Sequence, residues 1–213
     1  MEPKRERLET PRAAGLAGIV FALLLASAIV LMRVAIPASE AAADDVGPIN
    51  PGTKWAVSAA LELVPFAGLF FLWFMGALRA QVGEAEDKFV ATVFLGSGFV
   101  FVAAMFGAAA AAGTVLDEDA PSDFGRQFAY VLLTTYAMRM AAVFIFATST
   151  IGFRLGVFPR PLALLGYAAG LVLLFAGPAV PWCELVFPAW SLLVGVYILR
   201  VGLRAGRHPA EAV

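Results

Sequence analysis

Six apolar blocks of roughly twenty residues dominate this sequence and constrain its fold more than any other feature. They cover residues 13–36, 55–79, 89–113, 128–152, 161–180 and 184–203. About twenty helical residues cross the ~30 Å hydrocarbon core of a bilayer, because each residue adds about 1.5 Å. Lipid offers no partner to free backbone groups, so each block must be helical. We therefore predict an all-α polytopic membrane protein, a bundle of six transmembrane helices with short loops.

The composition agrees with this assignment. Of the 213 residues, 61% are hydrophobic, whereas a soluble domain is usually about 45–50% apolar. We expect a single membrane domain over residues 13–203, with a tail at residues 1–12 and another at 204–213, and no separate soluble domain. The lipid bilayer is the partner that this composition predicts.

Basic residues near the ends of the predicted helices indicate their orientation. One side of the membrane carries Lys4, Arg5, Arg7, Arg12, Arg79, Lys88, Arg154, Arg160, Arg200, Arg204 and Arg207. The loops of the opposite side are mostly acidic, with Lys54 and Arg126 as their basic residues. Because Lys and Arg are enriched on the cytoplasmic side, we predict that both tails are cytoplasmic. The opposite side is then the outer side.

Two alternatives to the six-span topology remain open at this level. The first block follows a basic start and precedes Ala41-Ala42-Ala43, which resembles a signal-peptide cleavage site. Its apolar stretch of about 24 residues exceeds the ~7–15 of a signal peptide, which favours an uncleaved helix. The fifth and sixth blocks are short, and a re-entrant pair is the alternative to two spans. Residues 177–182, rich in Gly and Pro, predict a tight hairpin between them.

Four ionisable residues within or beside the blocks are candidates for function. Arg139 lies near the middle of the fourth block, and Glu62 lies in the outer half of the second. Arg33 and Glu184 lie close to the outer boundary of the first and sixth blocks. A charged residue at the centre of a helix costs about 2.5–3.5 kcal/mol on insertion scales, so such residues usually serve a function.

The depths of Glu62 and Arg139 suggest that they form a pair. Counted from the outer ends of their blocks, Glu62 is about 10 Å deep and Arg139 about 17 Å, at 1.5 Å per residue. A long arginine side chain is able to cover the difference. We therefore predict a buried Glu62–Arg139 pair in the outer half of the bundle.

Neighbouring polar residues extend this candidate intramembrane polar site. Thr135 and Tyr136 share a helix face with Arg139, and we expect Arg33 and Glu184 to cap the pair on the outer side. Two interpretations stay open. The site binds a small solute or a coupling ion in a transporter, or it is a salt bridge that only fixes the packing of the helices.

Small residues on helix faces predict where helices approach closely. In the first block, Gly15, Gly18 and Ala22 lie on one face. In the fifth block, Gly166 and Gly170 form a G-x-x-x-G pair, which we interpret either as packing within the chain or as the contact surface of a homo-oligomer.

The sequence lacks the residues that several classes of function require. His208 in the tail is the one histidine and Cys183 the one cysteine, so haem ligation, a thiolate metal site and an intrachain disulfide are not predicted. No Walker A pattern, metal-ligand spacing, dinucleotide fingerprint or catalytic set is apparent, and no basic patch indicates nucleic acid. We expect no cofactor, no metal and no catalytic residues.

Two segments resemble a family of uncharacterised six-helix membrane proteins of high-GC bacteria. They are Thr148-Ser-Thr-Ile-Gly-Phe-Arg-Leu-Gly-Val-Phe-Pro-Arg-Pro-Leu-Ala-Leu-Leu-Gly-Tyr and Glu86-Asp-Lys-Phe-Val-Ala-Thr-Val-Phe-Leu-Gly-Ser-Gly. The resemblance implies a bacterial cytoplasmic membrane and no known activity. A transporter is therefore one expected function, and a non-catalytic structural or accessory subunit is the other.

Overall fold

The computed structural model describes residues 10–35, 54–82, 88–116, 123–176 and 180–205, and these ranges contain six helical rods and no strand. The α-helices are α1 (Thr10–Ala35), α3 (Lys54–Val82), α4 (Lys88–Gly113), α5 (Asp123–Val131), α6 (Met138–Arg154), α7 (Arg160–Phe175) and α8 (Val186–Ala205). A π-helix, η3 (Leu132–Ala137), joins α5 to α6 in one continuous rod, and short 3-10 turns occur at η2 (Thr114–Leu116) and η5 (Cys183–Leu185).

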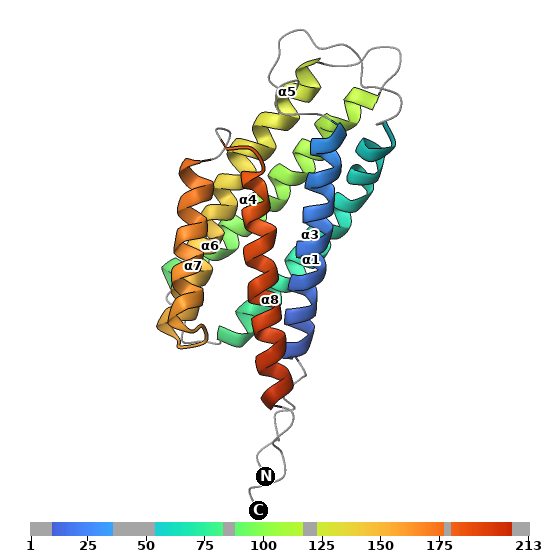
Figure 1. Cartoon of the computed structure of the whole chain (residues 1–213). Helices are drawn as coiled ribbons and strands as arrows, with labels where there is room; N and C mark the ends of the chain where they lie inside the picture. Colours follow the sequence, from blue (N-terminus) through green and yellow to red (C-terminus); the bar gives the residue numbers. More distant parts are fainter. Residues whose placement is uncertain (1–9, 36–53, 83–87, 117–122, 177–179, 206–213) are drawn as a thin grey trace, which may run out of the picture.

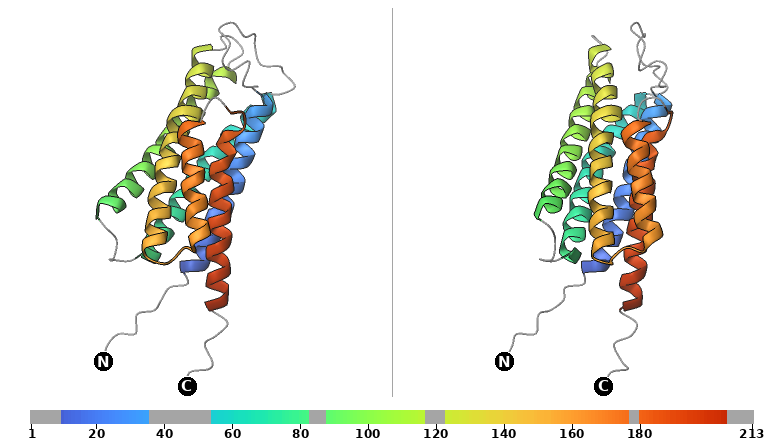
Figure 2. Two further views of the ribbon diagram at one scale, coloured as in Figure 1. Left: turned by 60° about the vertical axis from the view of Figure 1, so that its left-hand side comes forward. Right: turned by 90° about the vertical axis from the view of Figure 1, so that its left-hand side faces the viewer.

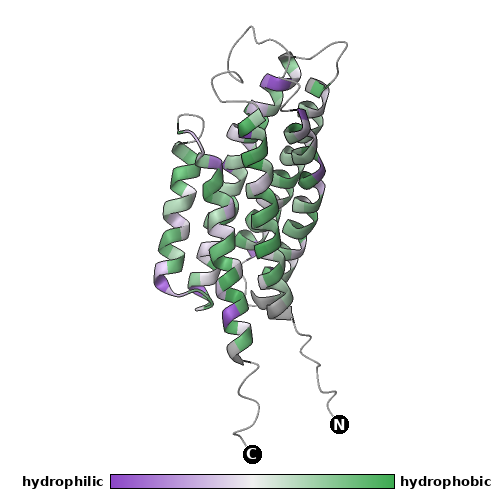
Figure 3. Cartoon of the chain, turned by 45° about the vertical axis from the view of Figure 1, so that its right-hand side comes forward, coloured by the Kyte–Doolittle hydropathy of each residue, from purple (hydrophilic) through white to green (hydrophobic). Residues whose placement is uncertain are grey.

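The bundle is a multi-pass membrane protein, as its hydropathy indicated. In the described residues, five helices are long and apolar enough to cross a membrane. Large apolar side chains are exposed along their lengths, among them Leu23, Phe99 and Leu171. Figure 3 colours the ribbon by hydropathy and shows green along most of each helix, with purple segments mainly near the ends. Lipid is the solvent that such a surface suits.

The sixth rod, α7, differs from its prediction. The sequence predicted a helix over residues 161–180, but α7 ends at Phe175 after 16 residues. It begins after Pro159 with Pro161 in its first turn, where the missing N–H of proline costs nothing. Residues 177–179 of the predicted hairpin lie outside the described residues. The fourth block also starts earlier than predicted, since α5 begins at Asp123.

The helices alternate in direction across the bundle (Figure 1). The start of α1 and the end of α8 lie at one end. The opposite end, which we call the distal end, holds the end of α1 and the beginnings of α3, α5 and α8. The helix α1 packs between α3 and α8, whereas α6 packs between α4 and α7 (Figure 2). Because the number of alternating rods is even, the first helix begins and the last helix ends on the same side of the bundle.

Aromatic rings fill the centre of the bundle. Five phenylalanines from five different helices are fully buried and contact one another: Phe21, Phe71, Phe101, Phe144 and Phe187. Their ring centroids lie 4.8–6.4 Å apart in tilted and edge-to-face arrangements, which favour the attraction between aromatic quadrupoles. This cluster fixes which face of each helix points inward.

The helices α1 and α8 approach through glycines, as the small-residue face of the first block predicted. A Cβ built on Gly195 would lie 3.0 Å from the backbone oxygen of Gly15 and 3.0 Å from the amide nitrogen of Ile19. A Cβ on Gly15 would lie 2.8 Å from the Gly195 oxygen. Gly18 and Ala22 are buried on the same face. Only glycine allows the two backbones to pack this closely.

The glycine pair of α7 is occupied within the chain. A Cβ on Gly166 would lie 2.0 Å from Ser149 Oγ of α6 and 3.0 Å from Trp190 Nε1 of α8. A Cβ on Gly170 would lie 2.7 Å from the Phe146 ring. The two glycines thus pack α7 against its own neighbours. An oligomer through Gly166 and Gly170 stays a prediction, and these intrachain contacts leave them no free surface.

Candidate functional site

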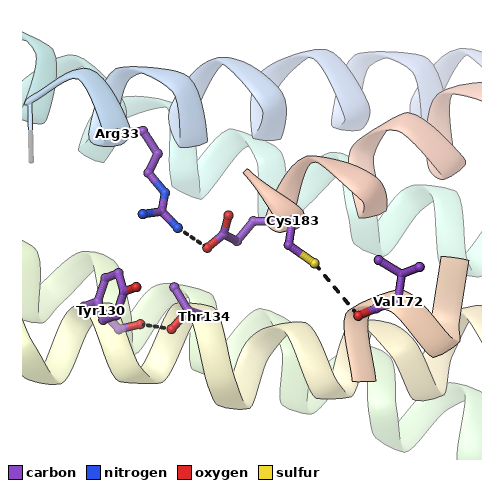
Figure 4. A network of polar contacts seen from close by, with 6 residues as sticks. Arg33, Tyr130, Thr134, Val172 and Cys183 are labelled. Atoms are coloured by element: carbon purple, nitrogen blue, oxygen red, sulfur yellow. Dashed lines mark hydrogen bonds and ion pairs between the residues drawn. The ribbon is translucent and has the colours of Figure 1, made fainter. Parts of the chain in front are cut away.

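An ion pair joins the first and last helices at the distal end of the bundle. Arg33 lies in the last turn of α1, and its Nη2 donates to Oε1 of Glu184 in the turn that precedes α8. Figure 4 shows the guanidinium pointing from α1 across to this carboxylate. The Glu184 side chain is 2% exposed and that of Arg33 is 12% exposed. The two residues predicted as caps of another pair therefore form the buried pair themselves.

The long rod of α5, η3 and α6 supplies the other wall of this site. The guanidinium carbon of Arg33 lies 5.6 Å from the centroid of the Tyr130 ring, a cation–π contact. Four residues later, Thr134 donates its hydroxyl hydrogen to the Tyr130 carbonyl oxygen at 2.8 Å (Figure 4). Thr134 belongs to the π-helix, a distortion that often accompanies functional sites.

A cavity of about 90 Å³ lies beside the ion pair. Its walls are mostly aliphatic and come from α1, α3, α4 and the α5–η3 segment. The apolar walls are Leu25, Ala28, Ile29, Met32, Ala60, Leu61, Val64, Met105, Ala108, Ala109, Ala112, Ala129 and Leu133, and the polar ones are Arg33, Arg126, Tyr130, Thr134 and Glu184. The site thus combines a small, mostly apolar cavity with the charged side chains of Arg33, Arg126 and Glu184.

One carboxylate oxygen of Glu184 has no hydrogen-bond partner among the described residues. Oε1 accepts from Arg33, whereas Oε2 is buried and has no hydrogen-bond partner among the described residues. A buried acceptor without a donor costs about 1–3 kcal/mol, and more when it is charged. Glu184 is one of the residues that line the cavity, so this unsatisfied acceptor belongs to a wall residue.

Arg126 is a residue of this site that the sequence did not single out. It was counted as a loop residue of the outer side, but it lies one turn into α5 and is 5% exposed. The signal was present in the sequence. In the described part of α5, Arg126 and Ala129 are buried whereas Phe124 and Phe128 are exposed, a pattern with helical spacing.

The predicted Glu62–Arg139 pair is wrong. Both side chains are exposed on the surface of the bundle, and no ion pair joins them in the part of the chain that the structure describes. The packing of Phe71 in α3 against Phe144 in α6, at 5.0 Å between ring centroids, explains why. Those rings define the inner faces of the two helices, and Glu62 and Arg139 lie on the outer faces.

The neighbours of Arg139 also lie away from the site. Tyr136 is 58% exposed and Thr135 is half-buried, and neither lines the cavity. Of the six residues predicted for the intramembrane polar site, the structure brings Arg33 and Glu184 together. Their neighbours in the cavity are Arg126, Tyr130 and Thr134.

The site has the groups for binding and for ion pairing. Among the described residues, no cluster of three or more His, Cys, Asp or Glu side chains is placed to hold a metal ion. Cys183 is buried next to Glu184, and its thiol lies 3.9 Å from the Val172 carbonyl oxygen. What the cavity offers is a carboxylate, two guanidinium groups and a phenol ring against aliphatic walls. Comparisons with protein-family models, with curated proteins and with solved structures found no match to this chain.

Proposed function

We propose that this chain is a membrane transporter that binds a small solute in the distal cavity. The observation that carries the proposal is the cavity itself, whose lining combines Arg33 and Glu184 with aliphatic walls, while Glu184 Oε2 has no hydrogen-bond partner among the described residues. Ionisable groups inside a membrane domain usually line substrate or ion pathways. Ligand pockets between the helices of a bundle combine such apolar walls with a few polar groups in the same way.

The dimensions and the chemistry of the cavity restrict the solute. Its 90 Å³ is well below the roughly 150 Å³ of an engineered cavity that binds benzene. The enclosed part of the solute is therefore a few heavy atoms in size. A head group that donates a hydrogen bond to Glu184 Oε2, such as an amine, a hydroxyl or an amide, suits the carboxylate. The aliphatic walls suit an apolar body.

Binding of such a donor also provides a route to conformational change. Arg33 and the solute would share one carboxylate, so the bond between Arg33 and Glu184 weakens as the solute binds. This bond ties the end of α1 to the beginning of α8. We infer that the solute loosens the distal end of the bundle, as alternating access requires.

Cysteine accessibility tests whether solutes reach the cavity. In a Cys183→Ser background, Ala108→Cys places a thiol in the cavity wall, and Ala142→Cys places a matched thiol in the core, away from it. We expect Ala108→Cys to react with a small membrane-impermeant methanethiosulfonate added from the distal side, and Ala142→Cys to remain unreacted. Transport further predicts reaction of Ala108→Cys from the opposite side of the vesicle membrane, at a lower rate.

The two outcomes separate binding from transport. An Ala108→Cys thiol that reacts only after denaturation would contradict a solute site. Reaction from the distal side alone would leave a binding site but would contradict alternating access. Mass spectrometry of the purified protein measures the modified fraction in each case.

A structural role is the second candidate, because the Arg33–Glu184 pair also joins two ends of the chain. In an accessory subunit, the pair would only fix the register of α1 against α8. This role predicts that the pair can be replaced by apolar side chains without loss of function in the cell, whereas the transporter requires Glu184.

We also propose that the chain lies in a bacterial cytoplasmic membrane with both tails in the cytoplasm. The basic flanks support the orientation, and the family resemblance supports the membrane. Single cysteines at Asp45, Asp119, Glu86 and Arg207 in the Cys183→Ser background test the topology. We expect an impermeant thiol reagent outside the cell to label positions 45 and 119. Labelling of position 86 from outside would contradict the orientation.

A further inference from the structure

Glu62 lies in the centre of a lipid-facing stripe on α3. The stripe also contains Trp55, Phe66, Leu69 and Trp73, all of them exposed. These residues are spaced seven, four, three and four apart, so they share one face of the helix. The Glu62 carboxylate is exposed on this face and has no intrachain ion pair among the described residues.

Arg139 occupies the corresponding place on another rod. It is exposed, and it lies fifteen residues from both ends of the apolar run Phe124–Arg154. The run is longer than the ~30 Å hydrocarbon core, and a residue at the middle of that core lies about 15 Å from either head-group layer. This is further than an arginine side chain reaches. A charge this deep and facing lipid is costly unless it finds a partner of opposite charge.

Within one copy, Glu62 and Arg139 point away from each other. Phe71 and Phe144 touch across the core, and the two charges lie on the opposite sides of the same helices. The described spans contain one other carboxylate, Glu184, which Arg33 already engages. Among the described residues, neither Glu62 nor Arg139 has an ion pair within the chain, so a second molecule is a source of the complementary charge.

When two copies lie side by side with the same orientation in the membrane, Glu62 of one copy and Arg139 of the other lie at similar depths. Leu61 and Val64 on either side of Glu62 line the same cavity as Leu133 and Thr134, so these segments lie at one level. Arg139 follows Thr134 by five residues, or roughly 7 Å. Its helix runs away from the distal end, and helical side chains incline toward the N-terminus, back toward the level of Glu62.

We propose that Glu62 of one copy pairs with Arg139 of a second copy, so that this chain associates head to tail in the membrane. The two charges lie on opposite sides of the bundle, so each copy offers one charge to each neighbour. Such a heterologous contact repeats and forms a ring or a chain rather than a closed symmetric dimer. The aromatic and aliphatic residues around Glu62 supply the apolar part of the contact.

A mixing experiment tests this contact in lipid vesicles. Glu62→Leu and Arg139→Leu each remove one charge, and each replacement is an apolar residue on a lipid-facing surface. We expect each variant alone to associate about tenfold more weakly than the unchanged protein, since an interhelical polar pair is worth on the order of 1 kcal/mol or slightly more. Mixed together, the two variants retain one complete Glu62–Arg139 contact and should form mixed dimers and nothing larger. Fluorescence co-localisation of differently labelled copies measures this.

Each other outcome contradicts the proposal. Association of the single variants at the unchanged level would show that the charges do not form the contact. Loss of association without recovery in the mixture would show that each charge has a different partner. An unchanged protein that remains monomeric in lipid would show that lipid alone satisfies Arg139.

Cross-linking with both charges intact provides a second measurement that does not depend on the charge variants. The experiment uses the Cys183→Ser background. Leu69→Cys on one copy places a thiol about two turns beyond Glu62 on α3. Val143→Cys on another copy places a thiol about one turn beyond Arg139 on α6. We expect oxidation to join this pair in mixed vesicles. A Leu164→Cys control on the exposed face of α7 should not join with Leu69→Cys. Equal yields in both mixtures would contradict the head-to-tail contact.

Discussion

Replacing Arg33 with methionine is expected to destabilise the bundle by about 3–5 kcal/mol, because it leaves the carboxylate of Glu184 buried without its ion pair. Glu184 is 2% exposed, so water cannot compensate for the lost guanidinium. The double variant Arg33→Met/Glu184→Met should recover most of the loss, since apolar side chains of similar volume often replace a buried pair at little cost. Unfolding in mixed micelles with increasing denaturing detergent measures the free energies.

The exposed Arg79 provides the matched control for this pair. It also lies in the last turn of a helix, and Arg79→Met should change stability by no more than about 0.5 kcal/mol. If the double variant is as unstable as Arg33→Met, then the two charges are not stabilising each other. The same double variant separates the two candidate functions, because a transporter that uses Glu184 would be stable and inactive.

Replacing Gly195 with alanine is expected to destabilise the contact between α1 and α8 by about 1–3 kcal/mol, in the range of overpacked cores. The new Cβ would meet the Gly15 carbonyl oxygen and the Ile19 amide nitrogen, both at 3.0 Å. Backbone atoms cannot move aside as a side chain can, so the two helices must separate. The same detergent unfolding experiment measures the loss of stability.

Gly76 and Gly96 provide the controls for this substitution. Nothing lies within 4 Å of a Cβ built on either of them. Alanine at these helical positions should leave stability unchanged or raise it by up to about 1 kcal/mol, because alanine favours the helix over glycine. A Gly195→Ala protein as stable as these controls would show that α1 and α8 pack less closely than the structure indicates.

The sequence predicted the number and the class of the helices because the bilayer sets both. Length and hydropathy suffice for this, and the boundaries of α1, α3, α4 and α8 lie close to the predicted ones. The end of α7 was predicted less well, because residues 176–180 are apolar enough to continue the block. Hydropathy does not distinguish a helix from an apolar loop at its end.

The candidate site was predicted in part, for a related reason. Depth along a helix follows from counting residues, and Arg33 and Glu184 were correctly placed at the same level. The direction in which a side chain points depends on which face packs inward. In a soluble helix the polar face gives this direction, but the helices here are apolar on all sides. Glu62 and Arg139 were therefore assigned to the inside although they lie on the lipid surface.

The shortness of α7 has a consequence for the lipid around it. Its 16 residues extend about 24 Å, whereas a typical hydrocarbon core is about 30 Å thick. Hydrophobic mismatch of this size is relieved by local thinning of the bilayer or by a change of tilt. The membrane beside α7 should therefore be thinner than beside the longer α4, and the protein should be more stable in bilayers of short-chain lipids than in thick ones.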